Sequence, residues 1–286
     1  MVTLTSTTMN KNDTGKIAKI RSAGFFTKGM VYVLLGSLTF MAALDLGGDI
    51  SSTRNVIKFL LELPLGKAFV GVISLGLFAY SIWRFYQTIK FPEGGLDNEK
   101  LKSGFKRLRY FYSGMFYGII AYAFAKPLLN KLTGSPKKDF ETDAVGDEKE
   151  ALWELLSYDW GKALIWALAL LIAGQAIQQF FIAYKGKFMQ KIDNYPSVKY
   201  EYDIIKRAGK LGYVARGMVF GVLAFFIIKV ILKHNANEYK GTEGALAYFL
   251  SFSYGHLLLA AVAFGLAAYG VFHIMVARHA NLTRLM

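Results

Sequence analysis

The chain has 286 residues, of which 54% are hydrophobic and 15% aromatic, and this composition is too apolar for an ordinary soluble domain. It contains no cysteine, which excludes disulfides, iron–sulfur clusters and thiol chemistry. The net charge of +14 is high enough for a nucleic-acid-binding protein, but the distribution of charge along the chain gives it another explanation.

The first segment, residues 1–15, is polar and rich in Thr and Asn. It lacks the apolar core and cleavage site of a signal peptide, so we expect a disordered cytoplasmic tail. The basic stretch from Lys16 to Arg21 then predicts the start of a helix at the membrane surface.

Six apolar runs follow, each close to the roughly 20 helical residues that span a bilayer. They lie at about 26–44, 66–88, 109–129, 162–184, 213–232 and 256–277. The sequence therefore predicts an all-α integral membrane protein with six transmembrane helices. The alternative is a soluble all-helical protein with buried helices, but six runs of this length rarely coexist in a soluble fold.

A local phrase recurs three times, as Lys28-Gly29-Met30-Val31-Tyr32, Ser113-Gly114-Met115-Phe116-Tyr117 and Arg216-Gly217-Met218-Val219-Phe220. A second glycine follows each phrase and starts the next apolar run; these are Gly66, Gly161 and Gly255. The pattern predicts three tandem helical hairpins, at residues 16–92, 93–184 and 185–286. Parallel repeats of this kind favour a pseudo-threefold ring about the membrane normal, although a line of three hairpins would give the same pattern.

The outer loops carry short apolar stretches at residues 56–61, 151–156 and 245–250. They are too short to span a membrane, and we interpret them as helices lying at the outer interface, with apolar loop plugs as the alternative. The middle loop is longer because of an acidic insertion, residues 133–150. We expect an exposed hairpin or mobile loop there; a solvated loop is preferred over a Ca²⁺ site because the spacing does not match an EF-hand.

Sorting the charged residues by side of the membrane orients the chain. With both termini in the cytoplasm, the cytoplasmic segments carry a net charge of +15 and the outer segments −1. This asymmetry is typical of proteins of the bacterial inner membrane, and it explains most of the basic excess through anionic lipid headgroups. No nucleic-acid partner is needed.

The repeated phrases resemble a bacterial membrane family known as domain of unknown function 1206, defined by three tandem pairs of transmembrane helices. The resemblance covers residues 16–280 and includes the second-helix phrases Gly76-Leu77-Phe78-Ala79-Tyr80 and Gly265-Leu266-Ala267-Ala268-Tyr269. The middle unit departs from the pattern at Arg109, Ser113, Leu171 and Gln175. The resemblance implies the architecture and no activity.

Polar residues within membrane spans are the best candidates for a site, because they are costly to bury. Aligning the second helices places Arg84, Gln179 and His273 at equivalent positions, with Gln175 and Gln178 nearby. These five side chains predict an uneven polar collar near the cytoplasmic mouth that would prefer an anion or a lipid headgroup. The simpler interpretation is that Arg84 extends to the headgroups while Gln and His make hydrogen bonds between helices.

The helix glycines have a structural interpretation. Gly29, Gly114, Gly118, Gly217 and Gly221 predict close helix packing, since two of the pairs have Gly-x-x-x-Gly spacing. Two basic residues precede these helices, and we expect them to mark the inner interface; they are Lys28 and Arg216.

The six apolar runs contain no Asp or Glu in their central parts, which disfavours a cation-coupled transporter or a cation channel. No catalytic, cofactor-binding or metal-binding motif is present, so we expect neither an enzyme nor a bound cofactor or metal. Two functions remain, with an integral-membrane enzyme as a third and weaker option. The chain binds or passes a small anionic or amphiphilic solute, or a lipid, through a central helix cavity. Alternatively, it is a non-transporting scaffold or accessory subunit that packs with lipid or with a partner membrane protein.

Overall fold

The computed structural model describes residues 11–47, 50, 52–90, 100–132, 143–186, 188–189 and 199–279, and every regular element within them is a helix. The six long helices are α1 (Lys11–Ala43), α3 (Gly66–Lys90), α4 (Lys100–Leu132), α6 (Asp159–Lys185), α7 (Lys199–Lys233) and α9 (Gly255–His279). The shorter ones are α2 (Thr53–Glu62), α5 (Asp143–Leu156), α8 (Gly241–Ala247) and the 3₁₀ helices η2 (Ala236–Glu238) and η3 (Tyr248–Ser251). The predicted all-helical fold is confirmed.

Five of the long helices are long and apolar enough to cross a membrane, one fewer than the sequence predicted. The spans are Ser22–Ala43, Gly66–Ile89, Asp159–Lys185, Tyr200–Lys233 and Gly255–Arg278. The predicted span 109–129 is helical in α4, but it is less apolar than the others because it carries four tyrosines, three of them within its first nine residues, and a lysine at position 126. Length does not exclude a crossing, since 33 helical residues extend about 50 Å.

The helices extend into segments that the sequence left irregular. α1 begins at Lys11, so the predicted disordered tail 1–15 is helical over its last residues, and residues 1–10 lie outside the described part. The basic stretch before the first span continues into α1 without a break. α5 begins at Asp143, within the predicted acidic loop 133–150, whose residues 133–142 are also outside the described part.

The three short apolar stretches that the sequence placed in outer loops form helices. They correspond to α2, to the end of α5, and to α8 with η3. α2 has a polar cap, because the Ser52 hydroxyl accepts a hydrogen bond from the backbone N–H of Asn55 at 3.4 Å. Their position at a membrane surface stays a prediction.

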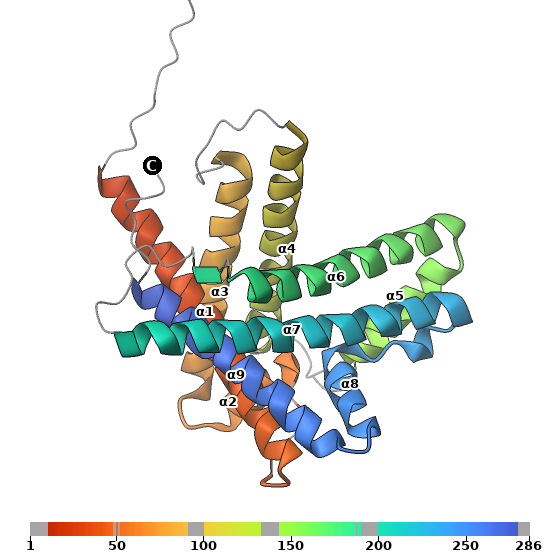
Figure 1. Ribbon diagram of the computed structural model, residues 1–286. Helices are drawn as coiled ribbons and strands as arrows, with labels where there is room; N and C mark the ends of the chain where they lie inside the picture. Colours follow the sequence, from red (N-terminus) through yellow and green to blue (C-terminus); the bar gives the residue numbers. More distant parts are fainter. Residues whose placement is uncertain are drawn as a thin grey trace, which may run out of the picture.

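Each second helix packs against the first helix of the next unit: α3 lies along α4, α6 along α7, and α9 returns to α1 (Figure 1). Two further contacts join helices of the same unit, α1 with α3 and α7 with α9. The long helices therefore follow the order α4, α3, α1, α9, α7, α6. The contact of the third unit with the first is one that a line of hairpins in chain order would not provide.

Two units close on themselves because glycine lets their helices approach. A Cβ added at Gly24 would lie 2.6 Å from the Tyr80 Cβ, and one at Gly212 would lie 2.5 Å from the Tyr269 Cα. In the middle unit Arg109 takes the equivalent position, and α4 makes no extensive contact with α6 among the described residues. The middle unit is therefore the place where the arrangement does not close.

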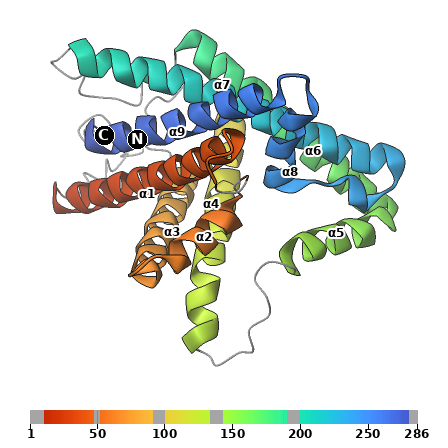
Figure 2. The ribbon, with the colours of Figure 1, turned by 90° about the horizontal axis from the view of Figure 1, so that it is seen from below.

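The helix pairs differ in direction. In Figures 1 and 2 the α3–α4 pair and the α6–α7 pair run along clearly different directions, so the molecule is not a simple parallel bundle. The contacts establish which helices are neighbours, while a pseudo-threefold ring about the membrane normal stays a prediction.

Most of the core lies where α1, α3, α4, α7 and α9 meet. Its largest fully buried side chains are mainly aromatic, and Tyr80, Phe124, Tyr213, Tyr269 and Phe272 are among them. A smaller apolar cluster joins α6 to the C-terminal half of α7. The aromatic part of the main core surrounds the candidate site.

Candidate functional site

Lys28 lies in the core rather than at a surface. Its side chain is buried, with 4% of the residue exposed, although Lys is among the residues least often found inside proteins. Its ammonium donates a hydrogen bond to the Tyr269 hydroxyl at 3.2 Å and lies 4.9 Å from the centre of the Tyr117 ring. The rings of Tyr269 and Tyr80 are 5.2 and 5.7 Å away. Cation–π contacts of this kind partly replace the lost hydration of the charge.

Arg216 reaches the same tyrosine from α7. Its Nη1 donates to the Tyr269 hydroxyl at 2.8 Å, so one phenolic oxygen serves two cations. The guanidinium also lies over the rings of Phe220 at 4.7 Å and Tyr32 at 5.7 Å. Residues from α1, α7 and α9 thus meet around Tyr269.

Arg84 on α3 makes the third cation of the group. Its Nε donates to the Tyr80 hydroxyl at 2.9 Å, and its Nη2 donates to the same oxygen. Nη1 donates to Gln87 Oε1 at 2.8 Å, and the guanidinium lies 5.5 Å from the centre of the Tyr110 ring on α4. Tyr80 connects this arginine to Lys28, because both cations lie over its ring.

These side chains form a cation–tyrosine cluster built by α1, α3, α4, α7 and α9. We define it as Lys28, Arg84, Arg216, Tyr32, Tyr80, Tyr110, Tyr117 and Tyr269. α4 has no Asp or Glu, and the apolar spans of α1, α3 and α9 have none; α7 has them only near its start, at Glu201 and Asp203. The cluster therefore concentrates positive charge with phenols, and not carboxylates, as partners.

The hydrogen bonds leave the cluster rich in donors. A hydroxyl has two acceptor lone pairs and one proton, and the oxygens of Tyr80 and Tyr269 each already accept two N–H groups. Their remaining capacity is as donors. The hydroxyl of Tyr117 and Nε of Arg216 are buried and have no hydrogen-bond partner among the described residues. Since buried donors are normally satisfied, the arrangement suits a ligand that supplies acceptor oxygens.

The predicted collar residues lie at three different helix interfaces. Arg84 lies between α3 and α4, where its Cβ would be 3.3 Å from a Cβ added at Gly114. Gln179 faces α7 in the same way, 3.3 Å from a Cβ added at Gly217. His273 belongs to the α9–α1 interface, where its ring stacks on Phe25 at 5.6 Å.

The collar is thus distributed, and only part of it borders the cluster. Arg84 belongs to the cluster, and His273 contacts it through the Tyr269 ring at 4.3 Å. Gln179 is buried on α6, and its Oε1 has no hydrogen-bond partner among the described residues. Gln175 and Gln178 are half-buried on the same helix.

Four of the five predicted packing glycines face another helix closely. A Cβ at Gly29 would lie 2.7 Å from the backbone oxygen of Gly270 on α9, and one at Gly118 would lie 3.1 Å from Ser81 Oγ on α3. Gly114 and Gly217 face α3 and α6 as described above. Gly221 does not share this role, because an added Cβ there would meet no atom within 4 Å.

The sequence identified all three cations of the cluster as candidates, but not their tyrosine partners. We expected Lys28 and Arg216 at the inner interface, and the structure places Lys28 in the core and Arg216 beside it. The tyrosines carried a signal, since Tyr80 and Tyr269 occupy the same register of their second helices. Each cation within an apolar run could have been compared with the tyrosines at equivalent positions of the repeated helices. That comparison would have indicated the cluster.

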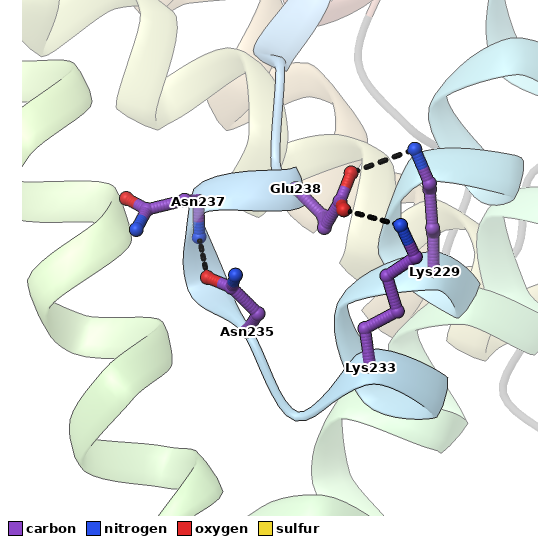
Figure 3. Close-up of polar contacts among 5 residues, drawn as sticks. All are labelled: Lys229, Lys233, Asn235, Asn237 and Glu238. Atoms are coloured by element: carbon purple, nitrogen blue, oxygen red, sulfur yellow. Dashed lines mark hydrogen bonds and ion pairs between the residues drawn. The ribbon is translucent and has the colours of Figure 1, made fainter.

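A second polar group lies at the other end of α7. Glu238 of η2 binds Lys229 and Lys233 through its two carboxylate oxygens, at 2.7 and 2.8 Å (Figure 3). Hydrogen bonds from these lysines lower the pKa of Glu238 to about 2. The backbone N–H of Asn237 donates to the Asn235 side chain at 2.9 Å and shapes the same turn. Because its polar groups are already paired, this group fixes η2 to α7 and is not a candidate ligand site.

Two of the histidines lie in other surroundings than a metal site. His256 Nδ1 lies 3.2 Å from the backbone oxygen of Ala43, and His273 stacks among aromatic rings. Within the described part of the chain, no group of three His, Asp or Glu side chains could hold a metal ion.

Three stretches of the chain match the family described as Domain of Unknown Function (DUF1206), at residues 23–90, 108–186 and 211–280. Together they cover more than half of the chain. The chain belongs to this family. The three matches coincide with the three two-helix units, so DUF1206 corresponds to the repeated unit.

One relative is a protein of Bacillus subtilis (strain 168) described as "Uncharacterized protein YxxB". It is 28% identical over 272 residues, which cover 93% of this chain and 92% of the relative. No solved structure matches this chain. The DUF1206 family therefore supports the repeat organisation, and the function has to be argued from the cluster.

Proposed function

We propose that this protein binds an anionic group, carried by a small solute or by a lipid, on the cation–tyrosine cluster. The observation that carries the proposal is the meeting of three cations around tyrosine hydroxyls whose acceptor capacity is already used. A buried excess of positive charge is costly, and an oxyanion would offset that cost while accepting the free donors. The proposed role is binding and not catalysis.

The repeat supports a central position for this site. Lys28 and Arg216 occupy equivalent positions in the first and third units, and so do Tyr80 and Tyr269. We propose that the three units surround the cluster in a pseudo-threefold frame whose axis follows the membrane normal. In this frame α4 is a sixth crossing, both termini are cytoplasmic, and the protein resides in the inner membrane of a bacterium.

The binding test uses the purified protein in a non-ionic detergent at constant ionic strength. The probes are inorganic phosphate and short-chain phosphatidylglycerol, with short-chain phosphatidylcholine as the zwitterionic comparison. A ligand that binds only the folded state raises its stability, by about 2.7 kcal/mol at 100 times the dissociation constant. We expect a higher melting temperature with one or both anionic probes.

The matched variants are Arg216→Gln and Arg278→Gln. Each removes one positive charge, but Arg278 is exposed near the end of α9 and lies outside the cluster. We expect Arg216→Gln to lose the stabilisation and Arg278→Gln to keep it. An equal response of the two variants, or no response of the wild type to either anionic probe, would contradict the proposal.

Passage across the membrane is tested separately. Proteoliposomes loaded with labelled phosphate report flux directly, and Arg84→Ala removes a cation of the cluster while leaving Arg216 in place. Flux that depends on Arg84 would support a transporter. Binding without flux would support a receptor or lipid-binding role.

A scaffold or accessory subunit is the second candidate. The observation that favours it is the exposure of α6, the least buried of the five apolar spans. Its exposed side chains include Trp160, Leu164, Leu170 and Ile177. A stable complex with another membrane protein that is lost on Leu170→Ser or Ile177→Ser, with anion binding absent, would favour this function.

A further inference from the structure

The order of packed helices ends at α4 and α6, and we call the place between these two helices the opening. These two helices are the ends of the order α4, α3, α1, α9, α7, α6, and they make no extensive contact with each other within the described residues. In the other units, glycines admit the partner helix: a Cβ at Gly76 would overlap Thr27, and one at Gly265 would lie 2.5 Å from the Ala215 Cβ. The equivalent residue of α6 is Leu171, which is half exposed. The middle unit therefore lacks the glycine that lets the two helices of each other unit pack together.

The two helices at this opening, and α7 beside α6, carry buried polar atoms that have no hydrogen-bond partner among the described residues. The Tyr117 hydroxyl belongs to α4, Gln179 Oε1 to α6 and Arg216 Nε to α7. Tyr117 and Gln179 are each only 4% exposed. Such groups are rare in folded proteins unless water or a ligand satisfies them. Two of the three are donors of the cation–tyrosine cluster, so the opening and the cluster adjoin.

The outward surfaces of the same two helices are apolar. On α4, Ile119 and Tyr122 are 61% and 62% exposed, and on α6, Leu164 and Leu171 are 53% and 50% exposed. Exposed apolar side chains on helices within a membrane match the acyl chains of lipids and offer no polar contact to a hydrated ion.

We propose that the ligand is a lipid with an anionic phosphate headgroup, which enters sideways between α4 and α6. Its phosphate binds the cation–tyrosine cluster, and its acyl chains remain against the apolar surfaces of α4 and α6. This inference rests on the proposed function and names the ligand of the same site. A lipid satisfies both observations at once, because its phosphate complements the cations and its chains cover the exposed apolar surface.

The first experiment measures lipid retention. The full-length protein is purified from vesicles of equal parts long-chain phosphatidylglycerol and phosphatidylcholine, and the lipids that remain bound are counted by native mass spectrometry. We expect phosphatidylglycerol to be enriched over phosphatidylcholine. The enrichment should fall about tenfold in Arg216→Gln, as expected for loss of one charged hydrogen bond, and persist in Arg278→Gln.

The second experiment tests the route with a neighbouring pair of substitutions on α6. Leu171→Trp adds volume at the position that should face α4, and Leu170→Trp adds the same volume about 100° around the helix. We expect Leu171→Trp to reduce phosphatidylglycerol retention severalfold and Leu170→Trp to leave it unchanged. Far-ultraviolet circular dichroism of both variants verifies that they fold.

The outcomes separate this inference from the proposed function. If dissolved phosphate stabilises the wild type through Arg216 while phosphatidylglycerol is not enriched, the site binds a soluble anion and the lipid proposal is wrong. If lipid binds but both tryptophan variants behave alike, the route between α4 and α6 is wrong. Loss of every response in Arg216→Gln and Arg278→Gln alike would reject the cluster itself.

Discussion

Tyr269 shows how a protein can bury cations without carboxylates. Its hydroxyl accepts from Lys28 and Arg216, and its ring lies about 5.2 Å from both charged groups. A phenol therefore offers an acceptor and a π face together, yet it leaves the positive charge in place. An aspartate would neutralise one cation and remove the attraction for an external anion. The choice of tyrosine is what makes the cluster a candidate site rather than a closed ion pair.

Tyr269→Phe tests this account at one atom. The substitution keeps the ring and removes the oxygen that serves both cations, so we expect the protein to lose about 2 kcal/mol or more of stability. Thermal unfolding in detergent should show the loss as a melting temperature several degrees lower. Tyr254→Phe is the control, because Tyr254 is exposed and outside the cluster. Equal melting temperatures for the two variants would show that the shared hydroxyl contributes little.

At the residue scale, the sequence revealed the chemistry but not the partners. Arg84 and His273 were identifiable from their place inside apolar runs, because such residues are costly there. The burial of Lys28 was not identifiable, since a lysine at the start of a span commonly extends to the headgroups. What reverses this behaviour is the arrival of Tyr80, Tyr117 and Tyr269 from three other helices, and a single sequence does not contain those distances.

At the scale of elements, local pattern predicted nearly every helix, and one of the six predicted spans, the one in α4, was not confirmed. Runs of about 20 apolar residues located five spans, and all the short loop stretches proved helical. α4 is the exception because its tyrosines supply the cluster, and those same side chains reduce its apolar character. The predicted helix boundaries were less accurate. α1 and α7 begin in the basic segments that precede their apolar runs, and hydropathy alone does not extend the helices into those segments.

Close packing between the helices depends on glycine. One glycine of α1 and one of α7 provide a matched pair of substitutions that test this. A Cβ at Gly36 would overlap the backbone of Ala267 on α9 and lie 2.7 Å from the Ala263 oxygen. Backbone atoms cannot rotate away, so we expect Gly36→Ala to destabilise the protein by about 1–3 kcal/mol. Gly221→Ala meets no atom within 4 Å and should be neutral or stabilise α7 by up to about 1 kcal/mol. Melting temperatures of the two variants check this; a similar loss in both would contradict the helix-packing assignment.

At the scale of the whole molecule, the repeat predicted three equivalent units but left their arrangement open. The returning contact of α9 on α1 could not be read from the chain, because a ring and a line have identical repeats. The opening was foreshadowed by the departures of the middle unit at Arg109 and Leu171, although their consequence depends on which helices face each other. Symmetry of sequence and asymmetry of packing thus coexist, and the asymmetric part of the packing is where we propose that the lipid enters.

Whether α4 crosses the membrane determines the number of crossings. That number decides on which side of the membrane each later segment of the chain lies. If α4 crosses, Leu65 before α3 and Ser157 before α6 lie on the same side of the membrane; if it does not, they lie on opposite sides. Tyr254 lies on the same side as Ser157 in both cases, because α6 and α7 cross between them.

The chain has no native cysteine, so single-cysteine variants at these exposed positions carry one reactive thiol each. We expect Leu65→Cys, Ser157→Cys and Tyr254→Cys all to react with a membrane-impermeant maleimide in right-side-out spheroplasts, since basic segments favour the cytoplasmic side and here they lie at the other ends of the helices. Tyr184→Cys, at the opposite end of α6, should react only after permeabilisation. Labelling of Ser157→Cys without labelling of Leu65→Cys would show that α4 does not cross, and the threefold frame around the cluster would have to be abandoned.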